Sequence, residues 1–299
     1  MALIINRRRI ASPEPADATR VGSVRTFLDA LERFERTSKL SFYYRGHPSF
    51  TYQLKPSVYR EESWIAFEDQ MFKELVLRCP NDLSSLESTF QTLVKMQHYG
   101  LPTRLLDLTS NPLIALFFAT DPANPTSESG EVVVFGVPKA EIKYFDSDTV
   151  SVIANLSRRP GTFSMPGANL TKAQFNKDER IRFLLHEIKH EKPYFEPMIV
   201  REHLESVVCV KPKMDNPRVL KQDGAFFLFG VNGKKTEPAS VSKDYIASSD
   251  ALRILVIGAD KRKIRQQLES LGISKGTVFP EIERVAEYIK STYIAKSET

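Results

Sequence analysis

Cysteine and long apolar runs are what this sequence lacks most clearly. Only two of its 299 residues are cysteines. Cys79 and Cys209 are too few for a disulfide framework and lack the spacing of a zinc site, which fits a reducing cytosol. No apolar run approaches the roughly 20 residues that span a bilayer, and arginines interrupt Met1–Ile10 where a signal peptide has its apolar core. We therefore expect a cytoplasmic protein without membrane contact.

The composition shows no extreme of charge. Hydrophobic residues make up 41% and charged residues 26% of the chain, which argues against disorder and allows one large core or two smaller ones. The formal net charge of +5 permits contact with nucleic acid, although a general solubility surface is the simpler explanation.

Helical and extended patterns together predict an α+β fold with helices flanking a mixed, mainly antiparallel β-sheet. Residues 1–20 are polar and contain proline, so we expect a flexible leader before a single domain at 21–295. Residues 138–178 have few periodic apolar positions and many turn formers, which predicts a long irregular excursion over a site. The oligomeric state does not follow from these patterns.

The strongest local signal is the stretch QHYGLPTRLLDLTSNPLIALFFAT, which starts at Gln97. Gly100 ends one helix, a short strand follows, and Pro112 stands at the first position of the next helix, where its missing N–H is not needed. The body of that helix is apolar on every side, which indicates burial. Its first turn favours an anion near Thr109 and Ser110.

Three polar residues of the same stretch predict a pocket. His98, Arg104 and Asp107 lie close in sequence to the expected anion position, and the fork of an arginine suits a phosphate or carboxylate. The alternative is a capped core helix, with Arg104 and Asp107 as a buried ion pair and His98 as a helix cap. Spacing alone does not separate these readings.

Two further segments are candidate rims of a cleft. The strand Leu40–Gly46 ends on an arginine, Arg45, whose stem we expect to be buried while its guanidinium faces the cleft; the alternative is an ordinary strand-end arginine in solvent. An extended segment at Tyr52–Arg60 adds positive charge if it packs alongside. Gln222 and Asp223 precede a later apolar strand.

A literal H-E-x-x-H occurs at His186, Glu187 and His190, a spacing that places two histidines on one helical face for zinc. The core-facing positions of that helix turn both histidines toward its charged side. No convincing third ligand is at hand, so we expect no metal and keep a zinc metallopeptidase as a minor alternative.

Four segments together resemble the FRG domain, a family named after an aromatic-Arg-Gly motif. They are Tyr44-Arg45-Gly46, the stretch from Gln97 to Ala119, QDGAFF from Gln222, and Leu268 to Ile282. The resemblance extends over roughly residues 40–289. The family usually has tryptophan after the aspartate, where this chain has Leu108.

The motif order of this family is similar to that of ADP-ribosyltransferases, and a fold of that type is what the similarity implies. It also implies that Arg45 holds NAD through its ribose and phosphates, while a late polar residue is catalytic. The residues it assigns to NAD are Tyr44, Arg45, Gly46, Arg104, Asp107, Thr109 and Ser110. Those it assigns to catalysis are Arg45, His98, Gln222 and Asp223.

The late catalytic position is the weak point of this similarity. Such transferases usually use a glutamate there, and a neutral Gln222 cannot supply its charge. Asp223, Glu205 and Glu281 remain open as the acidic group.

The expected function is therefore that of an NAD-consuming ADP-ribosyltransferase that modifies a protein or nucleic acid, as a toxin or phage-defence effector. NAD is its expected substrate, and the acceptor is unknown. The alternative is a non-catalytic module that binds a nucleotide or nucleic acid through arginines.

Overall fold

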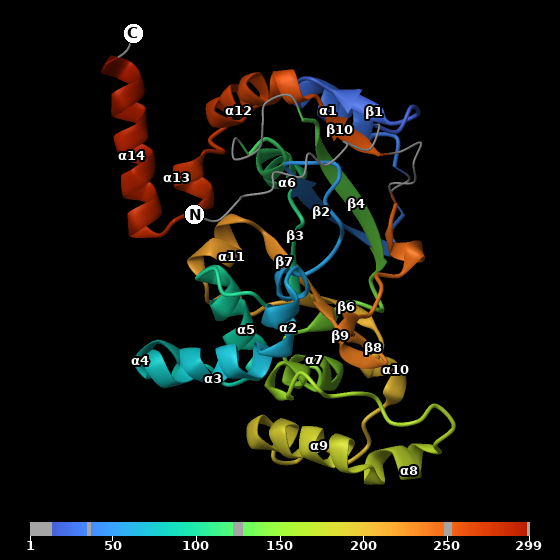
Figure 1. The fold of residues 1–299 in the computed structure, drawn as a ribbon. Coiled ribbons are helices and arrows are strands. Elements are labelled where there is room, and N and C mark those ends of the chain that lie inside the picture. The colour runs from blue at the N-terminus through green and yellow to red at the C-terminus, as the bar shows by residue number, and fades with distance from the viewer. Residues whose placement is uncertain (1–13, 35–36, 122–127, 248–252, 298–299) are drawn as a thin grey trace, which may run out of the picture.

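A computed structural model describes residues 14–34, 37–121, 128–247 and 253–297 (Figure 1). Its strands are β1 Thr19–Val21, β2 Leu40–His47, β3 Leu105–Thr109, β4 Gly130–Pro138, β5 Lys143–Tyr144, β6 Val207–Lys211, β7 Gly224–Phe229, β8 Val231–Asn232, β9 Lys234–Pro238 and β10 Ile254–Val256. Its α-helices are α1 Val24–Leu31, α2 Glu62–Ala66, α3 Glu68–Arg78, α4 Pro80–Leu83, α5 Thr89–His98, α6 Pro112–Ala119, α7 Asp148–Ala154, α8 Lys172–Lys177, α9 Glu179–Glu191, α10 Arg201–Leu204, α11 Pro217–Lys221, α12 Lys261–Ser270, α13 Lys275–Val278 and α14 Ile282–Ser297. Short 3₁₀ helices are η1 Ser57–Tyr59, η2 Asn155–Arg158, η3 Lys243–Tyr245 and η5 Gly258–Asp260.

Eight of the described strands form one sheet, in the order β1-β10-β4-β2-β3-β7-β6-β5. Only its two edge pairs, β1 with β10 and β5 with β6, are parallel. All inner neighbours are antiparallel. Helices flank this sheet (Figure 1), so the expected α+β class with a mixed, mainly antiparallel sheet is confirmed.

The apolar core is divided by the alternation of side chains along the strands. Tyr44 on β2 and Leu105 on β3 share one face, where α1, α6 and α12 pack over one half of the sheet and α5 and α7 over the other. The opposite face carries Tyr43 and Phe227, and η1, α2 and η3 pack against it. The first face is therefore covered by two separate groups of helices, and the space between them is where a site can form.

Helix α6 lies directly against β2. Its N-cap is Asn111, whose side chain accepts from the Leu113 N–H at 3.0 Å, and Pro112 occupies the first turn as expected. A Cβ on Gly46 would lie 1.8 Å from the carbonyl oxygen of Ala115, so the close approach of helix and strand requires glycine. The glycine of the Tyr-Arg-Gly motif is thus a packing requirement that holds α6 next to Arg45.

The predicted irregular excursion at 138–178 is wrong in its central part. Helix α7 and the following η2 lie there, and Val150, Val152 and Ile153 are buried. Because α7 packs between the sheet and α9, it is buried on nearly every side and shows no amphipathic period in the sequence.

Two further expectations about local structure are corrected. Residues 1–13 of the expected leader lie outside the described residues, but Thr19 and Arg20 belong to β1, paired in register with β10. The segment Tyr52–Arg60, expected to be extended, contains the 3₁₀ helix η1 and no strand. Pro56 precedes that helix and directs the chain into it.

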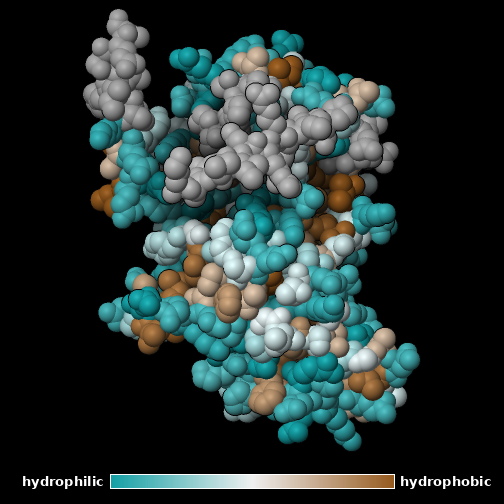
Figure 2. All heavy atoms as spheres, viewed as in Figure 1, coloured by the Kyte–Doolittle hydropathy of each residue, from teal (hydrophilic) through white to brown (hydrophobic). Residues whose placement is uncertain are grey.

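The surface in Figure 2 is mostly hydrophilic, with hydrophobic residues in separate small areas on the face shown. None of the helices in the described part of the chain is both long and apolar enough to cross a membrane.

Candidate functional site

A hollow of about 220 Å³ opens where β2 and β3 separate. The two strands share a single registered pair, Tyr44 with Thr109, whereas β2 pairs with β4 along its whole length. Beyond that pair the strands diverge and leave space beside Arg45. We call this space the Arg45 hollow, and its lining residues are Tyr44, Arg45, Gly46, His47, Pro48, Tyr52, Arg60, Asp107, Leu108, Thr109, Phe118, Asp121, Arg218 and Gln222.

Arg45 is held in the wall of this hollow by three groups. Its Nη1 donates to the carbonyl oxygen of Asp107 at 2.7 Å, and its Nε donates to His47 Nε2 at 2.9 Å. The carboxylate of Asp107 lies 3.9 Å from Nη1. Burial lowers the pKa of Arg45 to about 10 although Asp107 opposes this, so the guanidinium is still a cation at neutral pH. The prediction of a buried stem with its charge facing a cleft is confirmed.

His47 fixes the direction of the Arg45 side chain. Burial and the neighbouring Arg45, Arg60 and Arg253 lower the pKa of His47 to about 2, so its ring is neutral. A neutral ring accepts at only one nitrogen, here the Nε2 that faces Arg45. His47 therefore orients the guanidinium without adding charge to the hollow.

The charged groups around the hollow come from several elements. Arg60 follows η1, Arg218 belongs to α11, and Asp121 follows α6. Asp107 is more exposed than Arg45, with 58% of its side chain accessible, and Gln97 donates to its Oδ1 at 2.7 Å. The hollow therefore presents three arginines and two carboxylates.

The polar start of α6 lies beside the hollow. The Thr109 hydroxyl lines it and donates to the carbonyl oxygen of Gln222 at 2.6 Å. Ser110 does not line it; its N–H donates to the carbonyl oxygen of Asp223 at 3.0 Å. Both residues tie the end of β3 to the start of β7, and of the two only Thr109 lines the hollow.

Gln222 and Asp223, the two candidates for the late catalytic position, face different ways. Gln222 lines the hollow, and its side-chain amide donates to the Val278 carbonyl oxygen at 3.1 Å. Asp223 is exposed and lies outside the lining, with a φ of 46° and its carboxylate 3.3 Å from the Asn111 amide. Asp223 was predicted to belong to the site, but the structure places it outside the hollow.

Arg104 is also placed elsewhere. Its side chain is fully buried, donates from Nε to Glu68 at 2.9 Å and forms a second bond to the same carboxylate through Nη2. Lys235 Nζ lies 3.1 Å from Glu68, so a single carboxylate pairs with two buried cations. The alternative of an ion pair with Asp107 is wrong, because the partner of Arg104 is Glu68 from a distant segment, and the structure does not bring Arg104 into the lining of the Arg45 hollow.

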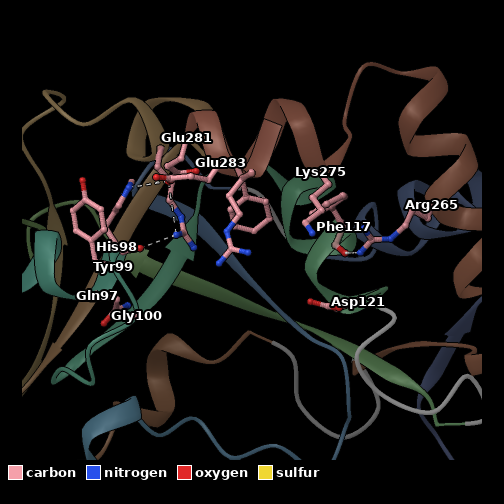
Figure 3. A pocket seen from close by; sticks show the side chains of 13 residues that line it. Gln97, His98, Tyr99, Gly100, Phe117, Asp121, Arg265, Lys275, Glu281 and Glu283 are labelled. Atoms are coloured by element: carbon pink, nitrogen blue, oxygen red, sulfur yellow. Dashed lines mark hydrogen bonds and ion pairs between the residues drawn. The ribbon is translucent and has the colours of Figure 1, made fainter. Parts of the chain in front are cut away.

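His98 lines a second, larger hollow of about 500 Å³ between the end of α5, α6, α11 and the C-terminal helices (Figure 3). We call it the His98 hollow. His98 Nε2 is 2.8 Å from Glu281, and Nδ1 is 3.3 Å from the Asn216 amide. Burial lowers the pKa of His98 although Glu281 acts against it. Asp121 and Arg218 line both hollows, which therefore adjoin.

The H-E-x-x-H helix is engaged in other contacts. Glu187 forms an ion pair with Arg158 at 2.8 Å and lies 4.0 Å from Arg159. No group of three or more potential metal ligands occurs in the portion of the chain that the structure describes. The minor zinc alternative gains no support from this arrangement.

Three titratable residues of the Arg45 hollow were not predicted from the sequence. His47 was detectable in principle, because it stands two residues after Arg45 on the same strand and so shares its face. Arg218 and Asp121 gave no local signal, since α11 is a single short turn and Asp121 reaches the hollow only through the packing of α6 on β2.

Comparison with known families gives one match. Residues 40–128 match the family model of the FRG domain, and the matched segment includes β2, β3 and α6. This part of the chain therefore matches the FRG domain, as the first two of the four resembling segments indicated, while the segments from Gln222 and from Leu268 lie outside the match. No curated protein and no solved structure matches the chain.

Proposed function

We propose that the Arg45 hollow binds NAD, holding its phosphates and adjacent ribose. The observation that supports this best is the fixed Arg45 guanidinium, which lines the hollow and makes two hydrogen bonds to described residues, fewer than its five N–H groups allow. Arg60 and Arg218 add positive charge from other elements. Charge-assisted, forked hydrogen bonds are the contacts that arginine makes with phosphates.

The reaction that we propose is transfer of ADP-ribose. The bond between the ribose C1′ and the nicotinamide nitrogen breaks, and a nucleophilic atom of a protein or nucleic-acid acceptor forms the new bond to C1′ and loses a proton. Asp107 is the carboxylate nearest to Arg45, and Gln97 holds it. A negative group there would stabilise the cationic ribose of the transition state.

A binding module without catalysis is the second candidate. It is favoured by one specific observation, that the late residue facing the hollow is the neutral Gln222 while Asp223 faces solvent. In this case the nucleotide would be bound and left intact.

Calorimetric titration with NAD tests binding. We expect wild-type protein to bind and Arg45→Met to lose at least about tenfold in affinity, because a charged hydrogen bond is worth roughly 1.5–3 kcal/mol. Arg25→Met, an exposed arginine on α1 away from the hollow, is the matched control and should bind as wild type does. Equal NAD affinities of Arg45→Met and wild type, with both proteins folded, would show that Arg45 does not contribute to NAD binding.

Release of nicotinamide from labelled NAD tests catalysis. Asp107→Asn should retain NAD binding and lose turnover, and label should appear on an acceptor only with active protein. We further propose that the protein acts as a toxin or phage-defence effector. Its expression in cells should then lower the cellular concentration of NAD. Binding without nicotinamide release, with protein and nucleic-acid acceptors supplied, would instead support the non-catalytic module.

A further inference from the structure

The Arg45 hollow is too small for a dinucleotide. Its volume is about 220 Å³, whereas pockets that enclose drug-sized ligands have roughly 300–1,000 Å³. NAD bound there through one ribose and its phosphates must extend into neighbouring space. The His98 hollow adjoins it at Asp121 and Arg218, and its volume is about 500 Å³.

The end of the His98 hollow at Asp121 is basic. Figure 3 shows Lys275, Arg265 and Phe117 gathered there, with Asp121 facing them. The Arg265 guanidinium stacks on the Phe117 ring at 4.2 Å, and its Nη2 donates to the Phe117 carbonyl oxygen at 3.2 Å. Its buried Nε has no hydrogen-bond partner among the described residues. This end can therefore take a phosphate that enters from the Arg45 hollow.

The far end of the same hollow has different chemistry. Tyr99 is 68% exposed, and its ring lies edge-on to His98 at 4.9 Å between centroids. Glu281 and Glu283 lie at this end in Figure 3. An exposed aromatic ring offers a stacking surface for a base, and carboxylates accept hydrogen bonds from ribose hydroxyls, as in other dinucleotide sites.

We propose that the His98 hollow binds the adenosine end of NAD, with the adenosine-side phosphate between Arg218, Arg265 and Lys275, the other phosphate at Arg45, and the base near Tyr99. This assignment rests on the proposed function of the Arg45 hollow. It makes the two adjoining hollows one extended site, with the nicotinamide end at Arg45 and the adenosine end at His98.

The test is titration of each half of the dinucleotide separately. ADP and nicotinamide mononucleotide are titrated into wild type, Arg265→Met, Lys275→Met and Arg45→Met. Arg265→Met and Lys275→Met should each lower the affinity for ADP and for NAD by about tenfold. Their affinity for nicotinamide mononucleotide should stay within about twofold of the wild-type value. Arg45→Met should lose more affinity for nicotinamide mononucleotide than for ADP. Arg262→Met, an exposed arginine on the same helix as Arg265, is the matched control and should bind all three as wild type does.

The outcomes separate the two proposals. NAD binding that depends on Arg45 but not on Arg265 or Lys275 overturns the adenosine site and leaves the Arg45 site intact. Absence of NAD binding by wild type contradicts both. Because Arg265 also packs on Phe117, its replacement can affect folding, and the melting temperature of each variant is measured with each titration. The Lys275 side chain is half exposed, so Lys275→Met tests the adenosine site if Arg265→Met does not fold.

Discussion

At the scale of single residues, the buried cluster of Glu68, Arg104 and Lys235 is the feature that sequence spacing could not reveal. Arg104 is adjacent to β3, and its partner Glu68 comes from α3, 36 residues earlier. Pairing across such a distance is decided by packing, and a local pattern that places Arg104 near Asp107 carries no information about it. The same applies to Arg218, which reaches the hollow from a one-turn helix.

Replacement of Glu68 tests this cluster. Glu68→Gln should lower the free energy of unfolding by about 3–5 kcal/mol, because it removes the carboxylate that pairs with the buried side chains of Arg104 and Lys235. Glu74→Gln, on the exposed side of the same helix, breaks only a surface pair with Arg78 and should cost less than about 1 kcal/mol. Urea unfolding measures both. Similar losses for the two variants would show that the buried cluster is not a special source of stability.

His47 should make stability depend on pH. Its pKa is lowered to about 2 in the folded chain by burial and by Arg45, while an unfolded histidine has a pKa of about 6.5. Below pH 6.5 the unfolded chain binds a proton that the folded chain does not. Stability from this residue is therefore complete at neutral pH and falls as pH decreases, by up to about 1.4 kcal/mol per pH unit.

The measurement is the free energy of unfolding between pH 6.5 and 5, a window in which carboxylates of ordinary pKa stay mostly ionised. His98 and His203, whose pKa values are also lowered by burial, contribute in the same direction. His47→Gln should reduce the slope without abolishing it. An unchanged slope in that variant would show that His47 is not held neutral in the folded protein.

At the scale of elements, the sequence predicted best where local signals and burial agree. The Pro112 start of α6 and the apolar strand β7 were found because proline and aromatic runs act locally. Helix α7 was missed, because burial on nearly every side removes the periodic pattern that identifies an amphipathic helix. Of the candidate site, Arg45, Thr109 and Gln222 were brought together, whereas Asp223 was misplaced because its backbone turns it toward solvent.

The contact of α6 with β2 can be tested through Gly46. Gly46→Ala places a Cβ within 1.8 Å of the Ala115 carbonyl oxygen and 2.7 Å of the Ala119 nitrogen. Since both atoms belong to the helix backbone, no side-chain rotation relieves the clash. We expect a loss of at least about 3 kcal/mol in unfolding free energy.

Gly167→Ala is the matched control for this substitution, because nothing lies near a Cβ at that position. Its unfolding free energy should change by less than about 1 kcal/mol. Equal stability of Gly46→Ala and Gly167→Ala in chemical denaturation would mean that α6 does not lie as close to β2 as described.

At the scale of the whole molecule, the site follows from how the sheet is covered. Two groups of helices occupy the two halves of one sheet face, and β2 and β3 separate between them. Arg45 and His47 alternate with Tyr44 and belong to the opposite face, so the hollow takes its lining from both faces of the sheet at this gap. Basic groups from several distant segments can meet there without interrupting either core cluster. The FRG-matching segment supplies β2, β3, α6 and the His98 side of the second hollow, while Arg218 and the rest of that hollow come from later parts of the chain.

The most direct test of this arrangement is a crystal structure of the protein with NAD. We predict that the pyrophosphate lies within about 3 Å of the Arg45 guanidinium, with the rest of the dinucleotide extending past Arg218 toward Arg265. A structure with NAD bound away from both hollows, or with both hollows empty at a saturating NAD concentration, would contradict the proposed site.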